Sequence, residues 1–225
     1  MVKFFEQCIE RHVELTGIDR SKLSAKKPFL LPGIEGSQLK EMAFDSAGEL
    51  SDIAAKVPTK CLYGARTCRW DLLHAINTLA REVTRWNKAC DIRLHKLTCY
   101  IQQSVDESLE GWIGDPMSDV HLMLYCDADF ASGLKSSKST SGACIVFVGP
   151  NTFMPLSEVC KKQTVVSHSS TEAEIVSLEI ALRTEALPIL SFWDLVRDVC
   201  LPQQSGGDYF ARLVGSCFRR GLGLS

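Results

Sequence analysis

The sequence predicts a mixed α/β protein in which a helical first half precedes a small sheet and a closing pair of helices. Apolar residues recur at helical spacing over residues 1–20 and again, more strongly, over 60–103. The pattern then becomes extended: residues 121–126 are apolar on both faces, as in a central strand, and 140–148 form a second apolar run. A helical pattern returns from about residue 170. These changes of period define the α/β class.

The first half is expected to hold three helices and an irregular connection. The first helix is amphipathic and ends near Gly17. Residues 21–60 are weakly periodic and are interrupted by Pro28 and Pro32, so they predict a loop or linker with one short helix at most. Two helices follow, one on each side of residues 86–87, and each carries an apolar stripe that can cover the other helix or a sheet.

Turn residues divide the second half into strands and helices. An Asp-Pro pair at 115–116 marks a turn before the first strand, and Gly-Pro-Asn at 149–151 closes the second. Residues 152–160 then suit a third, antiparallel strand. The helix that starts near residue 170 is expected to break at Pro188, because proline lacks the amide hydrogen that a helix interior uses, and a second helix follows over 189–200.

Composition excludes several classes of protein. The net charge of -2 over 225 residues argues against a generally basic nucleic-acid coat, although a local basic groove stays possible. The ten cysteines include no C-x-x-C pair, so we expect free, mostly buried thiols in a reducing compartment and no disulfide-linked partner. No apolar run approaches the roughly 18 residues of a membrane span, and the first residues do not form a signal peptide. We therefore expect an intracellular protein, cytoplasmic or nuclear, that does not bind a membrane.

Asp127 is the first residue with a chemical interpretation. It follows the predicted central strand directly, and Asp129 lies two positions later. A carboxylate at the end of a buried strand is costly unless it is solvated, hydrogen-bonded or bound to a cation. The plain alternative is an aspartate that caps the strand end as part of a turn.

Glu174 is the second such residue. Ser169 and Glu172 predict a capping box at the start of the helix, which leaves Glu174 without a capping role. Glu174 lies one turn before Leu178 and therefore near the packed face, where an unpaired carboxylate is disfavoured. The alternative is a rival capping box, formed by Thr171 with Glu174 on an exposed first turn.

Together, Asp127 and Glu174 predict a metal site. A strand-end carboxylate and a first-turn carboxylate, joined by two strands, can converge on one divalent ion, and hard oxygen ligands suit Mg²⁺ or Mn²⁺. We expect the two carboxyl groups to lie about 4 to 8 Å apart. We also expect residues 121–126 and 142–148 to pair as neighbouring antiparallel strands, with 135–139 as an exposed turn beside the site.

Four short motifs occur in order over about fifty residues around this pair. They are Asp-Ala-Asp-Phe-Ala at 127–131, Ser-Lys-Ser-Thr-Ser-Gly at 137–142, Lys-Lys-Gln at 161–163 and Ser-Ser-Thr-Glu-Ala-Glu at 169–174. The series resembles the RNase H region of copia-type retrotransposon polyproteins, and the ordered set is far more specific than any one motif. The resemblance implies hydrolysis of the RNA strand of an RNA–DNA hybrid by two metal ions, with Asp127 and Glu174 as catalytic metal ligands.

The resemblance extends upstream and suggests a domain organisation. Residues 62–66 (Leu-Tyr-Gly-Ala-Arg) and 69–71 (Arg-Trp-Asp) resemble the family segment after the reverse transcriptase core, although the family usually has proline where Trp70 stands. The expected regions are an unassigned helix and linker over 1–56, a helical region resembling the end of the reverse transcriptase over 57–119, a partial RNase H-like sheet with flanking helices over 120–200, and an unstructured tail over 201–225.

Two family features are absent from these 225 residues. The polymerase motif, an apolar strand with paired aspartates, does not occur, and nothing after Pro202 matches the Asp-Asn motif that supplies a third catalytic carboxylate. Asp208 is a lone aspartate in a loop-like context. With two ligands, magnesium binding should be weak, because its octahedral site depends on converging carboxylates and substrate phosphate.

The resemblance therefore leaves three functions open. The chain could be a working or partnered nuclease, a non-catalytic and non-functional relic of a retroelement, or a nucleic-acid-binding module without catalysis. We expect a catalytically incomplete domain whose partner is an RNA–DNA hybrid, recognised by shape, backbone and 2′-hydroxyl groups. Lys161 and Lys162 could contact its phosphates, or could equally be a solvated edge that blocks strand pairing.

Overall fold

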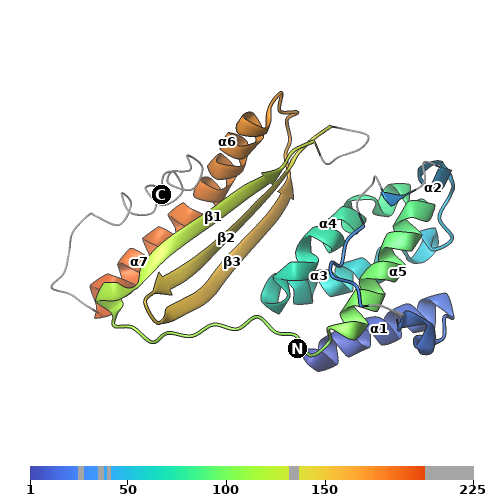
Figure 1. Ribbon diagram of the computed structural model, residues 1–225, viewed down its shortest axis with the longest axis horizontal. Coiled ribbons are helices and arrows are strands. Elements are labelled where there is room, and N and C mark those ends of the chain that lie inside the picture. Colours follow the sequence, from blue (N-terminus) through green and yellow to red (C-terminus); the bar gives the residue numbers. More distant parts are fainter. Residues whose placement is uncertain (25–27, 35–37, 40–41, 132–136, 201–225) are drawn as a thin grey trace. The chain divides into compact units, whose positions relative to one another are not determined.

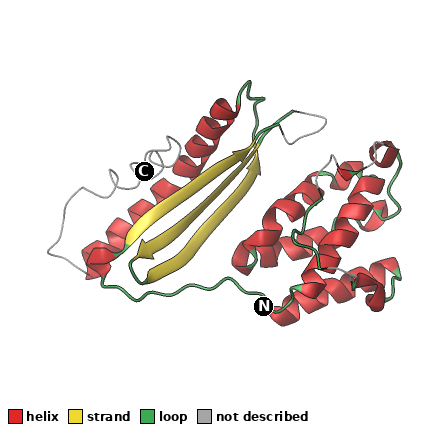
Figure 2. Ribbon diagram, in the orientation of Figure 1, coloured by secondary structure: helices red, strands yellow, loops and turns green. Residues whose placement is uncertain are grey.

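The chain folds into two compact units, as seen in a computed structural model that describes residues 1–24, 28–34, 38–39, 42–131 and 137–200. Unit 1 is Met1–Leu109 and is helical in its described residues, whereas unit 2, Glu110–Ser225, contains the sheet and two helices (Figures 1 and 2). The predicted mixed α/β class is confirmed at this level. Within the described ranges, no helix has both the length and the apolar character that crossing a membrane demands.

Unit 1 is built from short and medium helices joined by single-turn segments. Its elements are α1 (Val2–Thr16), η1 (Arg20–Leu23), α2 (Met42–Asp45), η3 (Ser51–Ile53), α3 (Lys56–Cys68), η4 (Trp70–Leu72), α4 (Leu73–Arg81), η5 (Val83–Arg85) and α5 (Lys88–Gln103). The predicted end of α1 is correct: Gly17 has a φ of 66°, a conformation that glycine adopts at no steric cost, and its N–H bonds to the carbonyl of Val13.

Two details of the prediction for unit 1 are wrong. Residues 21–60 hold more than one short helix, because η1, α2, η3 and the first turn of α3 all fall there. Elements of three or four residues are too short to show an apolar period in the sequence. The helix expected before residues 86–87 is also two helices, because the backbone leaves helical geometry at Arg69 between α3 and η4.

Arg69 fixes that junction between α3 and α4. Its guanidinium is 3% exposed and forms a two-pronged pair with Asp71, with Nε to Oδ1 at 2.9 Å and Nη2 to Oδ2 at 2.7 Å. It also donates to the carbonyl (2.6 Å) and the hydroxyl (2.9 Å) of Ser104, just beyond the end of α5. A charge this buried is tolerated because its hydrogen-bonding groups are paired. The Arg-Trp-Asp sequence thus ties three helices together.

Unit 2 contains a three-stranded antiparallel sheet in the order β1 (His121–Asp129), β2 (Thr140–Gly149), β3 (Thr152–Lys162). The predicted pairing of the first two strands is confirmed, with a register from His121 opposite Val148 to Asp129 opposite Thr140. The predicted end of the first strand is wrong, since β1 runs on through Asp127 to Asp129. The chain stays paired there because β2 continues alongside it, and the two aspartates occupy exposed positions of an alternating strand.

The predicted exposed turn over 135–139 is only partly described. Residues 132–136 lie outside the described residues. Ser137 is exposed, but Ser139 is fully buried, contrary to the prediction. Its hydroxyl accepts a hydrogen bond from the N–H of Ala131 at 3.1 Å, which joins the residue before β2 to the segment that follows β1.

Two helices cover one face of the sheet: α6 (Ser170–Ala181) and α7 (Leu187–Cys200), joined by the π-helical turn η7 (Leu182–Ala186) (Figure 2). The break predicted at Pro188 is therefore misplaced. The N–H of Leu187 bonds to the carbonyl of Leu182, and Pro188 then lies in the first turn of α7, where a missing amide hydrogen costs little. Strand and helix residues form a common apolar core, namely Leu122, Leu124, Ala143, Ile145, Ala181, Ala186, Leu190 and Trp193.

No disulfide bond joins the cysteines that the structure describes: Cys8, Cys61, Cys68, Cys90, Cys99, Cys126, Cys144 and Cys160.

His12 generates a prediction about the acid stability of unit 1. Its side chain on α1 is 1% exposed, and neither ring nitrogen has a hydrogen-bond partner among the described residues. Burial, and then the charge of His95, lowers the pKa of His12 from 6.5 to about 4. Between pH 6.5 and about 4, His12 binds a proton in the unfolded chain but not in the folded chain. The free energy of unfolding therefore decreases as the pH falls through this range.

We predict that His12→Leu makes unit 1 less sensitive to acid. The wild-type chain should lose about 3 kcal/mol more than the variant between pH 7 and pH 4. Urea unfolding followed by circular dichroism at several pH values measures this difference. The exposed His168 offers a matched control, because His168→Leu makes the same substitution in unit 2, outside the core of unit 1. Equal acid loss in wild type and His12→Leu would show that His12 is not buried in its neutral form.

Candidate carboxylate site

Asp127 lies near the end of β1 with its side chain exposed. It is paired with Gly142 of β2, and its Oδ1 accepts a hydrogen bond of 2.9 Å from the N–H of Ala128. One carboxyl oxygen is thus held by the backbone while the group stays open to solvent. This arrangement keeps a charged carboxylate at the strand end without burying it.

The start of α6 is fixed by the cap that the sequence predicts. The Ser169 hydroxyl accepts a hydrogen bond of 3.1 Å from the N–H of Glu172, and a Glu172 carboxyl oxygen accepts one of 2.7 Å from the N–H of His168. The return bond therefore reaches one residue further out than in the standard capping box. Ser169 and Glu172 cap the helix, and Glu174 takes no part in it.

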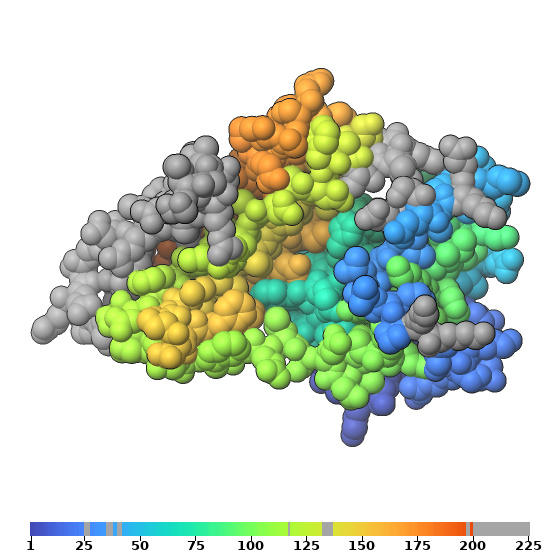
Figure 3. All heavy atoms as spheres, in the orientation of Figure 1, coloured from blue at the N-terminus to red at the C-terminus, as the bar shows by residue number. Residues whose placement is uncertain are grey.

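The structure brings Asp127 and Glu174 together. Burial raises the pKa of Glu174, the negative charge of Asp127 raises it further, and so does a hydrogen bond between the two side chains. The N–H of Ala128 acts in the opposite direction, because it donates to the Glu174 carboxylate. Both carboxyl groups therefore converge on the same stretch of β1. Figure 3 shows the end of β1 (yellow-green) and the start of α6 (orange) meeting on one surface.

Ser177 is a residue of this site that the sequence analysis missed. It lies three residues after Glu174, is fully buried, and donates a hydrogen bond of 2.6 Å from its hydroxyl to the carbonyl of Asp127. Its hydroxyl is also 3.5 Å from the carbonyl of Gly142, the strand partner of Asp127. The signal in the sequence is a lone hydroxyl on the apolar side of α6, one turn after the candidate glutamate.

Two adjacent carboxylates are a suitable donor set for a hard divalent ion. Asp127 is exposed, so water or a ligand's phosphate oxygens could complete the coordination. In the part of the chain that the structure describes, no three or more His, Cys, Asp or Glu side chains are grouped to hold a metal. Asp208 lies outside the described residues. Asp127 and Glu174 could therefore supply some, but not all, of the ligands of one Mg²⁺ or Mn²⁺.

Basic residues lie at the same end of the sheet. Lys162 is opposite Thr140, which is in turn opposite Asp129, and Lys161 is related to Ala128 in the same way through Ser141. Two strand spacings separate the lysine backbone from β1, or about 10 Å. Lys138 donates from its ammonium group to the carbonyl of Thr164 at 2.5 Å, in the loop before α6. Lys161 and Lys162 therefore lie two strands away from the carboxylate pair, at the same end of the sheet.

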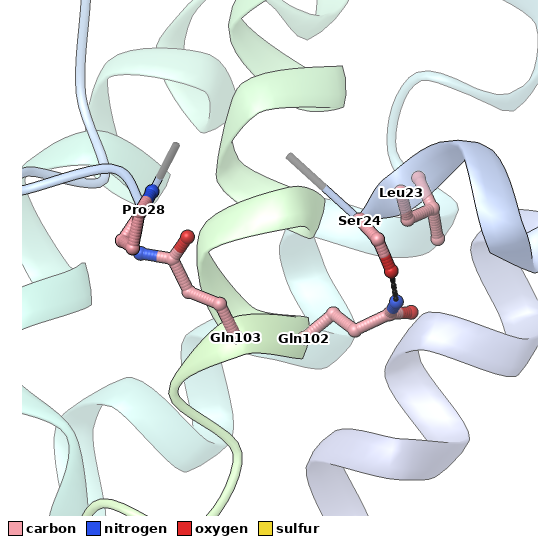
Figure 4. Close-up of a pocket in the computed structure, with 5 residues that line it drawn as sticks. All are labelled: Leu23, Ser24, Pro28, Gln102 and Gln103. Carbon is pink, nitrogen blue, oxygen red and sulfur yellow. Dashed lines mark hydrogen bonds between the residues drawn. The ribbon is translucent and has the colours of Figure 1, made fainter. Parts of the chain in front are cut away.

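A separate hollow in unit 1 has a different character. It measures about 250 Å³ and is lined by Leu23, Ser24, Pro28, Gln102 and Gln103 (Figure 4). The Gln102 amide donates to the Ser24 hydroxyl at 3.2 Å, and Gln103 exchanges two hydrogen bonds with the backbone of Phe29. These glutamines fasten the loop to α5. None of these five described lining residues is ionisable.

We predict that Asp127→Asn lowers the pKa of Glu174. The substitution keeps the shape of the side chain but removes the negative charge that disfavours ionisation of its neighbour. A pH titration of carboxyl ¹³C signals by NMR measures the change. Asp129→Asn is the matched control: it removes the same charge two residues away, and Asp129 does not contribute to the shift. An equal fall in both variants would contradict the pairing of Asp127 with Glu174.

No family model, no curated protein and no solved structure matches the chain. A function for this chain therefore has to be argued from the carboxylate site and from the ordered motifs that surround it.

Proposed function

We propose that unit 2 is an RNase H-like domain of a copia-type retrotransposon polyprotein, and that it is catalytically incomplete in this chain. The observation that carries the proposal is the meeting of Asp127 and Glu174, which the ordered motifs single out together. A three-stranded antiparallel sheet followed by a helix places the first carboxylate on β1 and the second on α6. In the same proposal, residues 57–119 are the end of the reverse transcriptase region.

In this proposal Asp127 and Glu174 hold one Mg²⁺ or Mn²⁺ between them. When bound, such an ion would orient a phosphate oxygen and neutralise its charge. The Ala128 N–H and the Ser177 hydroxyl keep the two carboxylates in place through the backbone of β1. The raised pKa of Glu174 has a direct consequence, because a cation that favours the ionised form must bind in competition with a proton.

The nucleic acid in this proposal is an RNA–DNA hybrid. Proteins read such duplexes by their shape, backbone and 2′-hydroxyl groups, so no sequence-specific contact is required. Lys161 and Lys162 lie across the sheet from the carboxylates, where they could neutralise phosphates of the strand that reaches the site. The overall charge of -2 requires that this attraction be local.

Cleavage of the hybrid needs more protein ligands than this pair supplies. The two-ion mechanism uses one ion to activate water and another to stabilise the leaving oxygen, and several carboxylates hold the ions. Asp127 and Glu174 account for one shared ion. Removing one essential group from a cooperating site usually removes nearly the whole effect. The expected state is a domain that retains part of a metal site without turnover.

We predict no appreciable cleavage of an RNA–DNA hybrid by the purified chain in Mg²⁺ or Mn²⁺. A fluorescently labelled hybrid analysed on denaturing gels measures this, with Asp127→Asn as the control for contaminating nuclease. Robust metal-dependent cleavage that disappears in Asp127→Asn would overturn the prediction. It would also bring forward Asp208, or a carboxylate from a partner chain, as the missing ligand.

A second candidate is a nucleic-acid-binding module without catalysis, and the position of the lysines favours it. We predict that Lys161→Ala with Lys162→Ala weakens hybrid binding and lowers the slope of log affinity against log salt by about two. Fluorescence anisotropy over a salt series provides the measurement. The control is Lys3→Ala with Lys22→Ala, which makes the same charge change at exposed positions of unit 1. Equal losses in the two double variants would indicate charge attraction without a defined surface.

A further inference from the structure

Gln163 follows the last residue of β3 and is 2% exposed. Its side-chain amide donates to the Ser141 hydroxyl at 3.0 Å and to the carbonyl of Ala173 at 2.8 Å. Its side-chain carbonyl accepts a hydrogen bond of 3.2 Å from the Ser167 hydroxyl, and its backbone N–H donates to the carbonyl of Ser139 at 2.9 Å. Both amide hydrogens and the carbonyl oxygen are thus used inside the protein, as a buried amide requires.

These partners are the immediate neighbours of the carboxylate site. Ala173 precedes Glu174 in α6. Ser141 is the strand partner of Ala128, whose N–H donates to the Asp127 carboxylate at 2.9 Å. The Gln163 side chain therefore connects Ala173, next to Glu174, to Ser141 of β2, which pairs with β1 beside Asp127.

The site needs such a connection because its two carboxylates repel each other. When both groups are ionised they repel each other, so the pair alone does not hold α6 against β1. Ser177 holds the helix to β1 one turn further along, and Ser169 caps the helix within its own segment. Gln163 is the side chain that ties the first turn of α6 to the sheet through two different hydrogen bonds.

We propose that Gln163 is a positioning residue for the carboxylate pair: it holds the start of α6 against β2 so that Glu174 meets Asp127, and it thereby sets how tightly the pair holds a divalent cation. The second part of the proposal, the effect on cation affinity, rests on the function proposed above. The first part, the placement of Glu174, depends only on the hydrogen bonds of Gln163. Partners that orient metal ligands typically alter metal affinity by about 10- to 100-fold when they are removed.

The experiment compares the full chain with Gln163→Leu, using selectively ¹³C-labelled carboxyl groups. The first readout, at pH 7, is the change that Asp127→Asn causes in the carboxyl ¹³C shift of Glu174. This change should be clear in the wild-type background and largely lost in the Gln163→Leu background, because the two side chains have separated. The second readout is Mg²⁺ affinity from a shift titration, which should fall by about 10- to 100-fold.

Thr152 provides the matched structural control. It is 3% exposed, begins β3 at the other end of the sheet, and its hydroxyl accepts hydrogen bonds of 3.1 Å from the N–H groups of Gly114 and Asp115. Thr152→Val should lower the melting temperature and leave both readouts unchanged. If Gln163→Leu behaves in the same way as Thr152→Val, Gln163 is only a structural residue and the proposal is wrong.

Two further outcomes also decide the matter. If Gln163→Leu does not fold, Ser141→Ala removes a single acceptor of the Gln163 amide and should shift both readouts in the same direction by a smaller amount; no shift would overturn the proposal. If the wild-type chain binds no Mg²⁺, the proposed metal site fails. The coupling between Asp127 and Glu174 then decides alone whether Gln163 positions them.

Discussion

Two carboxylates of like charge stay side by side only when other interactions hold their elements together, and unit 2 is organised around that constraint. Leu122 and Leu124 of β1 pack against residues of η7 and α7 on the covered face of the sheet. Burial of this apolar surface supplies the favourable free energy. The Ser177 hydroxyl then sets α6 against the carbonyl of Asp127 at 2.6 Å. The carboxylate pair is thus a consequence of the packing beneath it and opposes that packing electrostatically.

Two buried polar side chains of unit 1, Arg69 and His12, are accommodated in different ways. Arg69 keeps its charge because Asp71 and Ser104 satisfy its guanidinium on several sides, and removal of the Asp71 carboxylate would leave the buried charge without its nearest counter-ion. His12 has no such partner and is accommodated by staying neutral. The second arrangement fails in acid, because the imidazole must then bind a proton in a buried position.

Long periodic elements could be predicted from the sequence, and short or paired ones could not. The helix ending at Gly17 and the pairing of β1 with β2 follow from the spacing of apolar residues, which reports directly on burial. The sequence pattern ends β1 too early because Asp127 is polar, although its ladder with β2 continues. The π-helical turn before Pro188 has no period of its own and depends on a backbone register shift that side chains do not reveal.

Only the ionisable residues of the site could be predicted from the sequence. Asp127 and Glu174 are conspicuous because a carboxylate beside an apolar run needs an explanation. Ser177 looks like an ordinary polar residue in the sequence, and Gln163 stands out only as a member of the Lys-Lys-Gln motif. The importance of both comes from partners 50 and 22 residues away, Asp127 and Ser141. Such partners are defined by strand register and helix rotation, which no local pattern encodes. The reaction itself depends on the resemblance to the copia-type RNase H region and stays a proposal.

The most direct test of the carboxylate site is the paramagnetic broadening of backbone amide signals by substoichiometric Mn²⁺ in the isotopically labelled full chain. A shared ion should broaden residues 126–129 and 172–176 together. Residues 149–152, roughly 20 Å or more away along the same sheet, should stay sharp. Asp127→Asn should abolish the broadening of both segments at once. Broadening of one segment alone, or broadening that Asp127→Asn does not change, would contradict a site shared by Asp127 and Glu174.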